Sequence, residues 1–368
     1  MINFAISCTL LVSVELLGQL AYFVKTGNFL PLDEGANSVQ SRVFEIHPYL
    51  AIRLQPSIVI ENQNKVIKTT ALHTRWTGAE EDDHELIRIA ILGGSTAFGT
   101  GVTDQDSWPA LLQAKLGKQF AVINYGVPGY STAENIVQMA LIVPEKRPHI
   151  IVFYEGWNDI RNYHVKNNGP DYYYHGVRQY GNLGVETYKK QSRFEDLKNV
   201  FASIRLLKKF QNFGSSNTGN NPDIFEIPDQ QVDKYYRRNL NTLKMLSENI
   251  GALAIFVPQL LNYSDFEGGQ NSRYWTQHIK DDAMPFLMVR FNALMDDLCR
   301  PAEHQCTVFN EILDEPWHSD DFVDDGHFNR SGGMKFADKI YRLIMAKHQA
   351  KVIKNQLSEG SHLNSLVY

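Results

Sequence analysis

The chain has 368 residues, a formal net charge of −5 and three cysteines. This length allows one large buried core with room for an appendage. The charge is mild and no lysine- or arginine-rich block stands out, which argues against nucleic acid as the main partner. Three cysteines make no disulfide framework and show no metal-ligand spacing. Cys299 and Cys306 could pair in an oxidising compartment, and the sequence leaves free thiols equally open.

The first residues predict an attachment to a membrane. Residues 2–24 are mostly apolar and about long enough to cross a bilayer, which takes roughly 20 residues. Glu15 and Gln19 weaken this prediction, because polar groups at mid-membrane are costly. No basic residue precedes the run and no small-x-small cleavage site follows it, so residues 1–24 are predicted to be an uncleaved anchor. The alternative is an amphipathic helix packed on the domain.

The rest of the chain alternates between strand-like and helical patterns. Residues 25–85 are predicted to be a connecting region, in which residues 44–60 could form edge strands. Strands are then predicted over residues 86–92, 120–124, 150–154, 253–257 and 307–309. Such alternation predicts an α/β fold, a three-layer α/β/α sandwich around a mostly parallel five-stranded sheet.

Helix signals fall between these strands. Ser107 and the following proline begin one helix that Gly117 can close, and Ser131 with Glu134 forms a capping box for the next. Residues 230–250 and 336–343 repeat apolar side chains at helical spacing. The domain is predicted to end at residue 348, followed by a tail over residues 349–368.

The segment over residues 162–229 is an insertion into this pattern. It is rich in tyrosine, and an apolar stripe over residues 197–204 lies beside lysine and arginine. The stripe could belong to a lid or to a helix lying on a membrane. We favour an ordinary amphipathic helix whose stripe faces the core.

Four residues that can do chemistry follow predicted strands or precede the last helix. Ser95, Gly129 and Asn158 come just after the first, second and third strands, and His327 precedes the last helix. In a doubly wound sheet, ligands bind at the carboxyl ends of the strands. We therefore expect these four loops to converge on one edge of the sheet.

The residue types at that edge suit acyl transfer. Ser95 is a nucleophile once His327 accepts its proton, and Asp324 can hold the imidazole in one tautomer. Asp325 is the competing carboxylate. The backbone N–H groups of Ser95 and Gly129 and the side-chain amide of Asn158 are candidate oxyanion donors. This chemistry requires no cofactor and no metal.

Other known binding and catalytic motifs do not match the sequence, because the residues that they require are missing at the required positions. Residues 92–101 lack the lysine that ends a phosphate-binding P-loop and the spacing of a dinucleotide site. The nucleophile elbow of α/β-hydrolases requires glycine where Ala97 stands. Val323 and Gly332 occupy positions where a calcium-binding EF-hand loop needs oxygen ligands.

Four sequence blocks together resemble those of the SGNH (GDSL-like) hydrolase family. They are Gly93–Thr96, Asn124–Gly129, Gly156–Asp159 and Asp324–His327. The resemblance covers about residues 86–348 and implies a flavodoxin-like sandwich with a Ser-His-Asp site. Gly-Gly-Ser-Thr replaces the usual Gly-Asp-Ser-Leu, a variant also seen in esterase branches that act on sugars.

These observations together lead to the hypothesis that the protein is a serine esterase that forms an acyl-enzyme. With a membrane anchor and a domain outside the cytoplasm, its substrate would be an acylated glycan or lipid of the cell envelope. Trp157 could stack on a sugar ring or simply pack in the core. An O-acyltransferase would use the same site, and a non-catalytic envelope carbohydrate-binding protein is the alternative from another class.

Overall fold

The computed structural model describes residues 43–62, 65–80, 85–176, 226–266, 276, 278–299 and 305–364, together with seven positions between residues 13 and 24. Most of the predicted anchor and the apolar stripe at 197–204 therefore lie outside the described residues. Within the part of the chain that is described, no helix combines the length and apolar character needed to cross a membrane. The anchor stays a prediction.

Five parallel strands form the central sheet, in the spatial order β6-β5-β7-β8-β9. They are β5 (Ile87–Gly93), β6 (Phe120–Asn124), β7 (Ile150–Tyr154), β8 (Leu253–Val257) and β9 (Cys306–Val308). This is the flavodoxin-like order, in which the chain reverses direction across the sheet after β6. The predicted fold class is confirmed, and the predicted strands are displaced by one residue at most.

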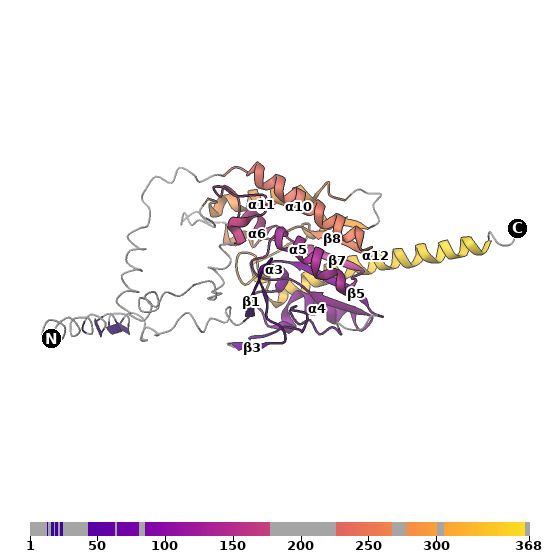
Figure 1. Ribbon diagram of the computed structural model, residues 1–368, viewed down its shortest axis with the longest axis horizontal. Coiled ribbons are helices and arrows are strands. Elements are labelled where there is room, and N and C mark those ends of the chain that lie inside the picture. The colour runs from indigo at the N-terminus through magenta and orange to yellow at the C-terminus, as the bar shows by residue number, and fades with distance from the viewer. Residues whose placement is uncertain are drawn as a thin grey trace.

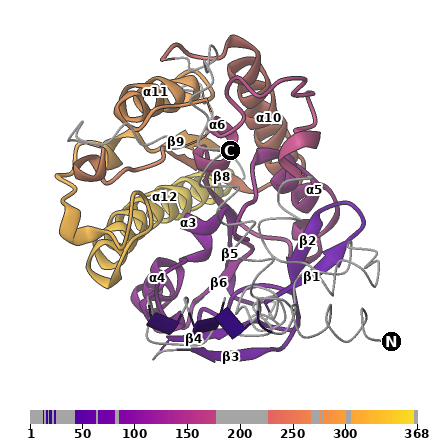
Figure 2. The ribbon, with the colours of Figure 1, turned by 90° about the vertical axis from the view of Figure 1, so that its left-hand side faces the viewer.

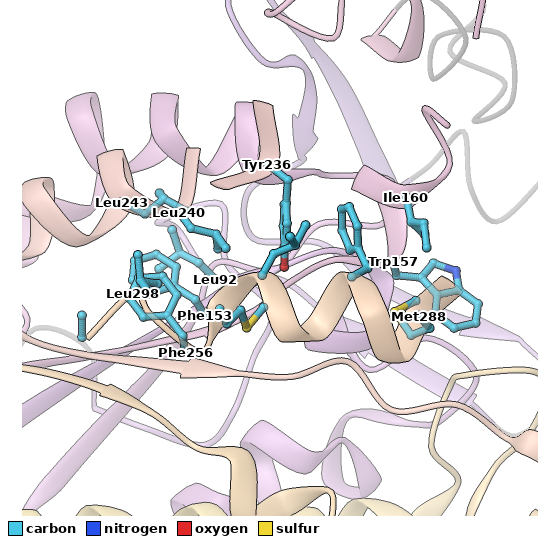
Figure 3. Close-up of a cluster of buried hydrophobic side chains, with 14 of the residues drawn as sticks. Leu92, Phe153, Trp157, Ile160, Tyr236, Leu240, Leu243, Phe256, Met288 and Leu298 are labelled. Atoms are coloured by element: carbon cyan, nitrogen blue, oxygen red, sulfur yellow. The ribbon is translucent and has the colours of Figure 1, made fainter. Parts of the chain in front are cut away.

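Helices cover both faces of the sheet (Figures 1 and 2). Helices α4 (Trp108–Leu116) and α12 (Arg330–Asn364) pack on one face, and α5 (Thr132–Leu141), α10 (Gln230–Asn249) and α11 (Met284–Asn292) on the other. Side chains alternate accordingly along β5: Ile89 and Ile91 join the α4 and α12 core, whereas Ala90 and Leu92 join the opposite one. Figure 3 shows that second core, with Phe153 and Phe256 below Tyr236 of α10.

The helix ends follow the local signals in the sequence. The capping box of Ser131 and Glu134 is formed at the start of α5. Helix α4 begins after Ser107 and ends at Gly117, which adopts a φ of 73°. The Ser107 hydroxyl does not cap the helix, because it donates to the Asp104 carbonyl at 2.7 Å instead.

The C-terminal part of the chain holds a long helix and a disulfide. Helix α12 continues beyond the predicted boundary at residue 348 and ends at Asn364. A disulfide joins Cys299 to Cys306, the first residue of β9, so the pairing that the sequence left open is formed here.

Residues 43–80 form a unit that we call the N-terminal module. Its strands β1 (Phe44–His47) and β2 (Ala51–Leu54) form one antiparallel hairpin, and β3 (Val59–Asn62) and β4 (Lys65–Lys68) form another. Residues 44–60, where edge strands were predicted, thus contain β1, β2 and the start of β3, but these strands do not join the central sheet at its β6 edge. That edge is occupied instead by Arg75, whose N–H donates to Asn124 of β6 at 3.0 Å.

The module packs on the turn that follows Ser95. Its apolar side chains form a separate small core with Phe98, Val127 and Tyr130 of the main domain. In Figure 2, the β3–β4 hairpin lies below α3 (Ser95–Phe98) and the β1–β2 hairpin lies to its right. The module is thus positioned to influence the candidate site.

Candidate active site

Ser95, the candidate nucleophile, lies in the short turn that follows β5, which we call the nucleophile turn. Ser95 is the first residue of α3, and Gly93 before it has a φ of 153°. A Cβ at Gly93 would lie 2.5 Å from the carbonyl oxygen of Tyr154 on β7. Only glycine fits this close approach of two strands, which explains the small residues that precede Ser95.

Ser95, His327 and Asp324 form a continuous hydrogen-bonded chain. The Nε2 atom of His327 lies 2.7 Å from Ser95 Oγ. Its Nδ1 atom lies 2.8 and 2.9 Å from the two carboxylate oxygens of Asp324. A carboxylate can only accept here, so Nδ1 carries the hydrogen and Nε2 is free to accept the Ser95 proton.

Asp324 is held as a carboxylate. Partial burial by itself raises the pKa of Asp324, but the hydrogen bond and charge of His327 outweigh burial and bring the pKa below its ordinary value. The backbone N–H groups of Gly326 and His327 donate to Oδ1 at 3.0 and 2.8 Å and act in the same direction. Asp324 therefore remains ionised and can stabilise an imidazolium throughout the neutral range.

A cation site is the other chemistry that this loop could support. Ligand atoms of Asp324, Asp325 and His327 lie within 4.8 Å of one another. Both ring nitrogens of His327 are already engaged, by Asp324 on one side and Ser95 on the other. The arrangement therefore suits proton transfer better than metal ligation, and the loop offers no set of free ligands.

Asn158, one of the candidate oxyanion donors, lies against the turn that carries Ser95. The buried side-chain amide of Asn158, in α6 (Trp157–Ile160), donates to the Tyr130 carbonyl at 2.8 Å. A Cβ at Gly94 would lie 2.4 Å from that same nitrogen, so Asn158 touches the residue before Ser95. An amide carries two N–H donors, so the bond to Tyr130 uses one of the two that Asn158 has.

Gly129 has a partner that the sequence did not indicate. His175 lies at the start of the insertion, and its Nε2 atom is 2.8 Å from the Gly129 carbonyl oxygen. Gly129 itself has a φ of 91°, a conformation that favours glycine. No local motif marks His175, because the contact joins segments 46 residues apart.

Two buried carboxyl groups, those of Asp159 and Glu155, form hydrogen bonds with side chains of α5. Asp159 accepts hydrogen bonds from the backbone N–H and the hydroxyl of Thr132, tying the end of the third block to α5. Burial raises the pKa of Asp159 to about 7, and the Thr132 hydrogen bonds oppose this shift. The neighbouring Glu155 bonds to Asn135, and burial raises its pKa as well.

Arg75 is a second residue that the sequence did not single out. Its side chain is fully buried and forms an ion pair with Asp104, with Nε 3.1 Å from the carboxylate. Its Nη1 donates to the carbonyls of Phe98 and Gly99 at 2.8 and 2.6 Å, and its Nη2 to that of Val102 at 2.8 Å. Arg75 thus connects the N-terminal module to the turn that holds Ser95.

Trp157 does not offer a stacking surface. It is only 3% exposed and belongs to the core shown in Figure 3. A Cβ at Gly326 would lie 2.7 Å from its ring, so Trp157 supports the His327 loop by packing. The prediction of a sugar-stacking role for Trp157 is wrong, because its faces are already covered. Tyr173 and Tyr174, in the predicted insertion, are 70% and 48% exposed.

The fold is a flavodoxin-like α/β/α sandwich, and Ser95 follows the first strand of its central sheet, β5. The sequence model of the GDSL-like lipase/acylhydrolase family matches residues 91–333. The chain belongs to this family, and it is a hydrolase. The match begins after the N-terminal module, which therefore lies outside the part that the family shares.

The solved structures to which the chain is similar share little of its sequence. An esterase EstA from Pseudoalteromonas sp. is 15% identical, with 71% of this chain and 97% of that chain covered at a TM-score of 0.37. A catalytic mutant of the acetylxylan esterase Axe2 from Geobacillus stearothermophilus is 15% identical, with 70% and 93% covered and a TM-score of 0.37. An acetyl xylan esterase, AlAXEase, is 14% identical, with 70% and 100% covered at 0.38. No curated protein matches the chain.

Proposed function

We propose that this hydrolase is a serine esterase in which Ser95, His327 and Asp324 act as nucleophile, base and orienting acid. The observation that carries the proposal is the unbroken chain from Asp324 through His327 to Ser95 Oγ. These distances lie within the range needed for direct proton transfer.

The proposed reaction has two halves. Ser95 Oγ attacks the carbonyl carbon of the ester while His327 Nε2 accepts the hydroxyl proton. The resulting oxyanion is bound by the N–H groups of Ser95 and Gly129 and by the amide of Asn158. The bond to the alcohol breaks, and His327 returns its proton to the leaving oxygen. Water then attacks the acyl-enzyme in the same way and releases the acid.

We further propose that the substrate is an ester of the cell envelope, carried on a glycan or a lipid. The Cys299–Cys306 disulfide supports a location outside the cytoplasm, because disulfides persist mainly in oxidising compartments. The apolar run at residues 2–24 supports attachment to a membrane. Binding of the purified full chain to lipid vesicles, compared with a chain lacking residues 1–24, tests the attachment.

The proposal is tested with an active-site probe and a simple ester. A fluorophosphonate probe is expected to label the purified protein and not its Ser95→Ala variant, and p-nitrophenyl acetate hydrolysis should be lost with it. Equal labelling of both proteins would refute the assignment of Ser95. A labelled acyl donor offered together with a glycan separates hydrolysis from acyl transfer, since hydrolysis releases the label as free acid.

A second comparison tests the acid. Asp324→Asn is expected to lower kcat by about 10⁴-fold, because the imidazole is then held in the wrong tautomer. Asp325→Asn is the matched control from the same loop and should retain most activity. A larger loss in the control would assign the role to Asp325.

A further inference from the structure

A small pocket lies between the N-terminal module and the turn that follows Ser95. Its volume is about 110 Å³. The module provides one wall and the main domain the other, and the lining residues are Val43, Phe44, Ile67 and Arg75 from the module and residues 98–102 and Pro128 from the domain. The module wall lies outside residues 91–333, the part of the chain that the family model matches.

The walls of the pocket belong to, or pack against, the segments that carry the proposed catalytic groups. Phe98 closes the single turn of α3 that begins at Ser95, and one helical turn rises only about 5.4 Å. Pro128 directly precedes Gly129. On the opposite side, a Cβ at Gly101 would lie 2.7 Å from Val323, whose N–H donates to the His327 carbonyl at 2.8 Å.

The chemistry of the walls favours an apolar occupant. The lining is mainly aliphatic and aromatic, and the guanidinium of Arg75 is occupied by Asp104 and by backbone carbonyls. It therefore has little capacity to bind an anion. The Thr100 hydroxyl is the one buried side-chain oxygen of the described lining that has no hydrogen-bond partner.

The volume limits how large that occupant can be. An apolar protein cavity of about 150 Å³ accommodates benzene, with its six carbons. By that comparison, a space of about 110 Å³ holds on the order of four carbon atoms. A long fatty acyl chain would have to displace the module.

We propose that this pocket receives the acyl group of the ester and that the N-terminal module restricts it to about two to four carbons. The inference rests on the proposed esterase function and adds the substrate class. The module thereby determines specificity, while the catalytic groups lie wholly within the family domain. Ile67 of β4 is the wall residue best suited to a test, because it is partly buried and far in sequence from the catalytic groups.

The test is a chain-length profile measured with p-nitrophenyl esters of acetic, butyric, hexanoic and octanoic acid. The parent is expected to lose at least about tenfold in kcat/KM between butyrate and hexanoate, since one ill-fitting methylene costs about 10–200-fold. Ile67→Ala opens the wall and should raise the ratio of hexanoate to butyrate by at least about fivefold. Ile67→Phe should shift preference the other way, toward acetate.

Val59→Ala is the matched control, because Val59 lies on the paired strand β3, is 60% exposed and does not line the pocket. It should keep the parental profile. A parent that hydrolyses octanoate as well as butyrate, or an unchanged profile in both Ile67 variants, would overturn the pocket assignment and leave the esterase standing. A parent that hydrolyses none of the esters and resists the fluorophosphonate probe would overturn the proposed function itself.

Discussion

Arg75→Met is expected to destabilise the protein and to loosen the nucleophile turn. The substitution keeps an apolar stem of similar length but removes every donor of the guanidinium. Asp104 is left buried without its ion-pair partner, and the carbonyls of Phe98, Gly99 and Val102 lose hydrogen bonds of 2.6–2.8 Å. Arg75 is fully buried, so water cannot simply replace it.

The size of the effect follows from the burial of the pair. Removing one partner of a buried ion pair costs about 3–5 kcal/mol. That is a large part of a total free energy of unfolding of about 5–15 kcal/mol. Adding Asp104→Asn removes the uncompensated charge and retains an oxygen for the Lys68 N–H, so the double variant should recover about 1–3 kcal/mol.

The loss of stability in Arg75→Met is expected to depend on pH. Burial raises the pKa of Asp104 even with Arg75 beside it, and loss of Arg75 removes the largest interactions that oppose burial and leaves those of Lys68. A carboxyl group with a raised pKa binds more protons in the folded state, so its contribution to stability falls as pH rises above about 3.9. The deficit of Arg75→Met should therefore widen from about pH 4 toward neutrality and narrow on acidification.

Urea unfolding of the parent, Arg75→Met and the double variant measures these differences. Fluorophosphonate labelling of Ser95 in folded protein reports on the turn, and slower labelling is expected in Arg75→Met. Unfolding within about 1 kcal/mol of the parent at pH 7 would refute the argument, because a buried charge left unpaired costs more than that.

Three further outcomes are expected from the same site. Gly94→Ala should lower kcat by about 10²–10³-fold, because the added methyl group would displace the Asn158 amide. Gly176→Ala is the control and should not lower kcat, because a Cβ at Gly176 would meet nothing within 4 Å. Equal losses in the two variants would contradict the steric argument. Asp159→Asn should remove a decline in the free energy of unfolding, on the order of 4 kcal/mol, that the raised pKa of about 7 predicts for the parent between pH 4 and 7. Parallel stability curves for parent and variant would exclude that pKa. His175→Ala should lower kcat about fivefold with little change in KM, because the loop of Gly129, a proposed oxyanion donor, loses one hydrogen bond of about 1 kcal/mol. Unchanged kinetics would make the contact incidental.

The fold could be predicted because short strand and helix patterns alternate along the sequence. Strands such as Phe120–Asn124 and Ile150–Tyr154 are short apolar runs between helix signals, and such patterns depend only on neighbouring residues. The capping box of Ser131 formed for the same reason. Parallel strands then bring their carboxyl ends to one edge, which is why Ser95 and His327 could be predicted to meet.

The sheet, its helices and the residues that meet at its edge could therefore be predicted from the amino-acid sequence alone. Three features could not: the burial of Trp157, the reach of Arg75 across 23 residues to the Phe98 carbonyl, and the wall that the hairpins of the N-terminal module form in the pocket. Periodicity records which face of an element is apolar, but not which distant segment will cover it. Contacts of that kind depend on how separate elements pack together, and those contacts define the candidate specificity pocket of this hydrolase.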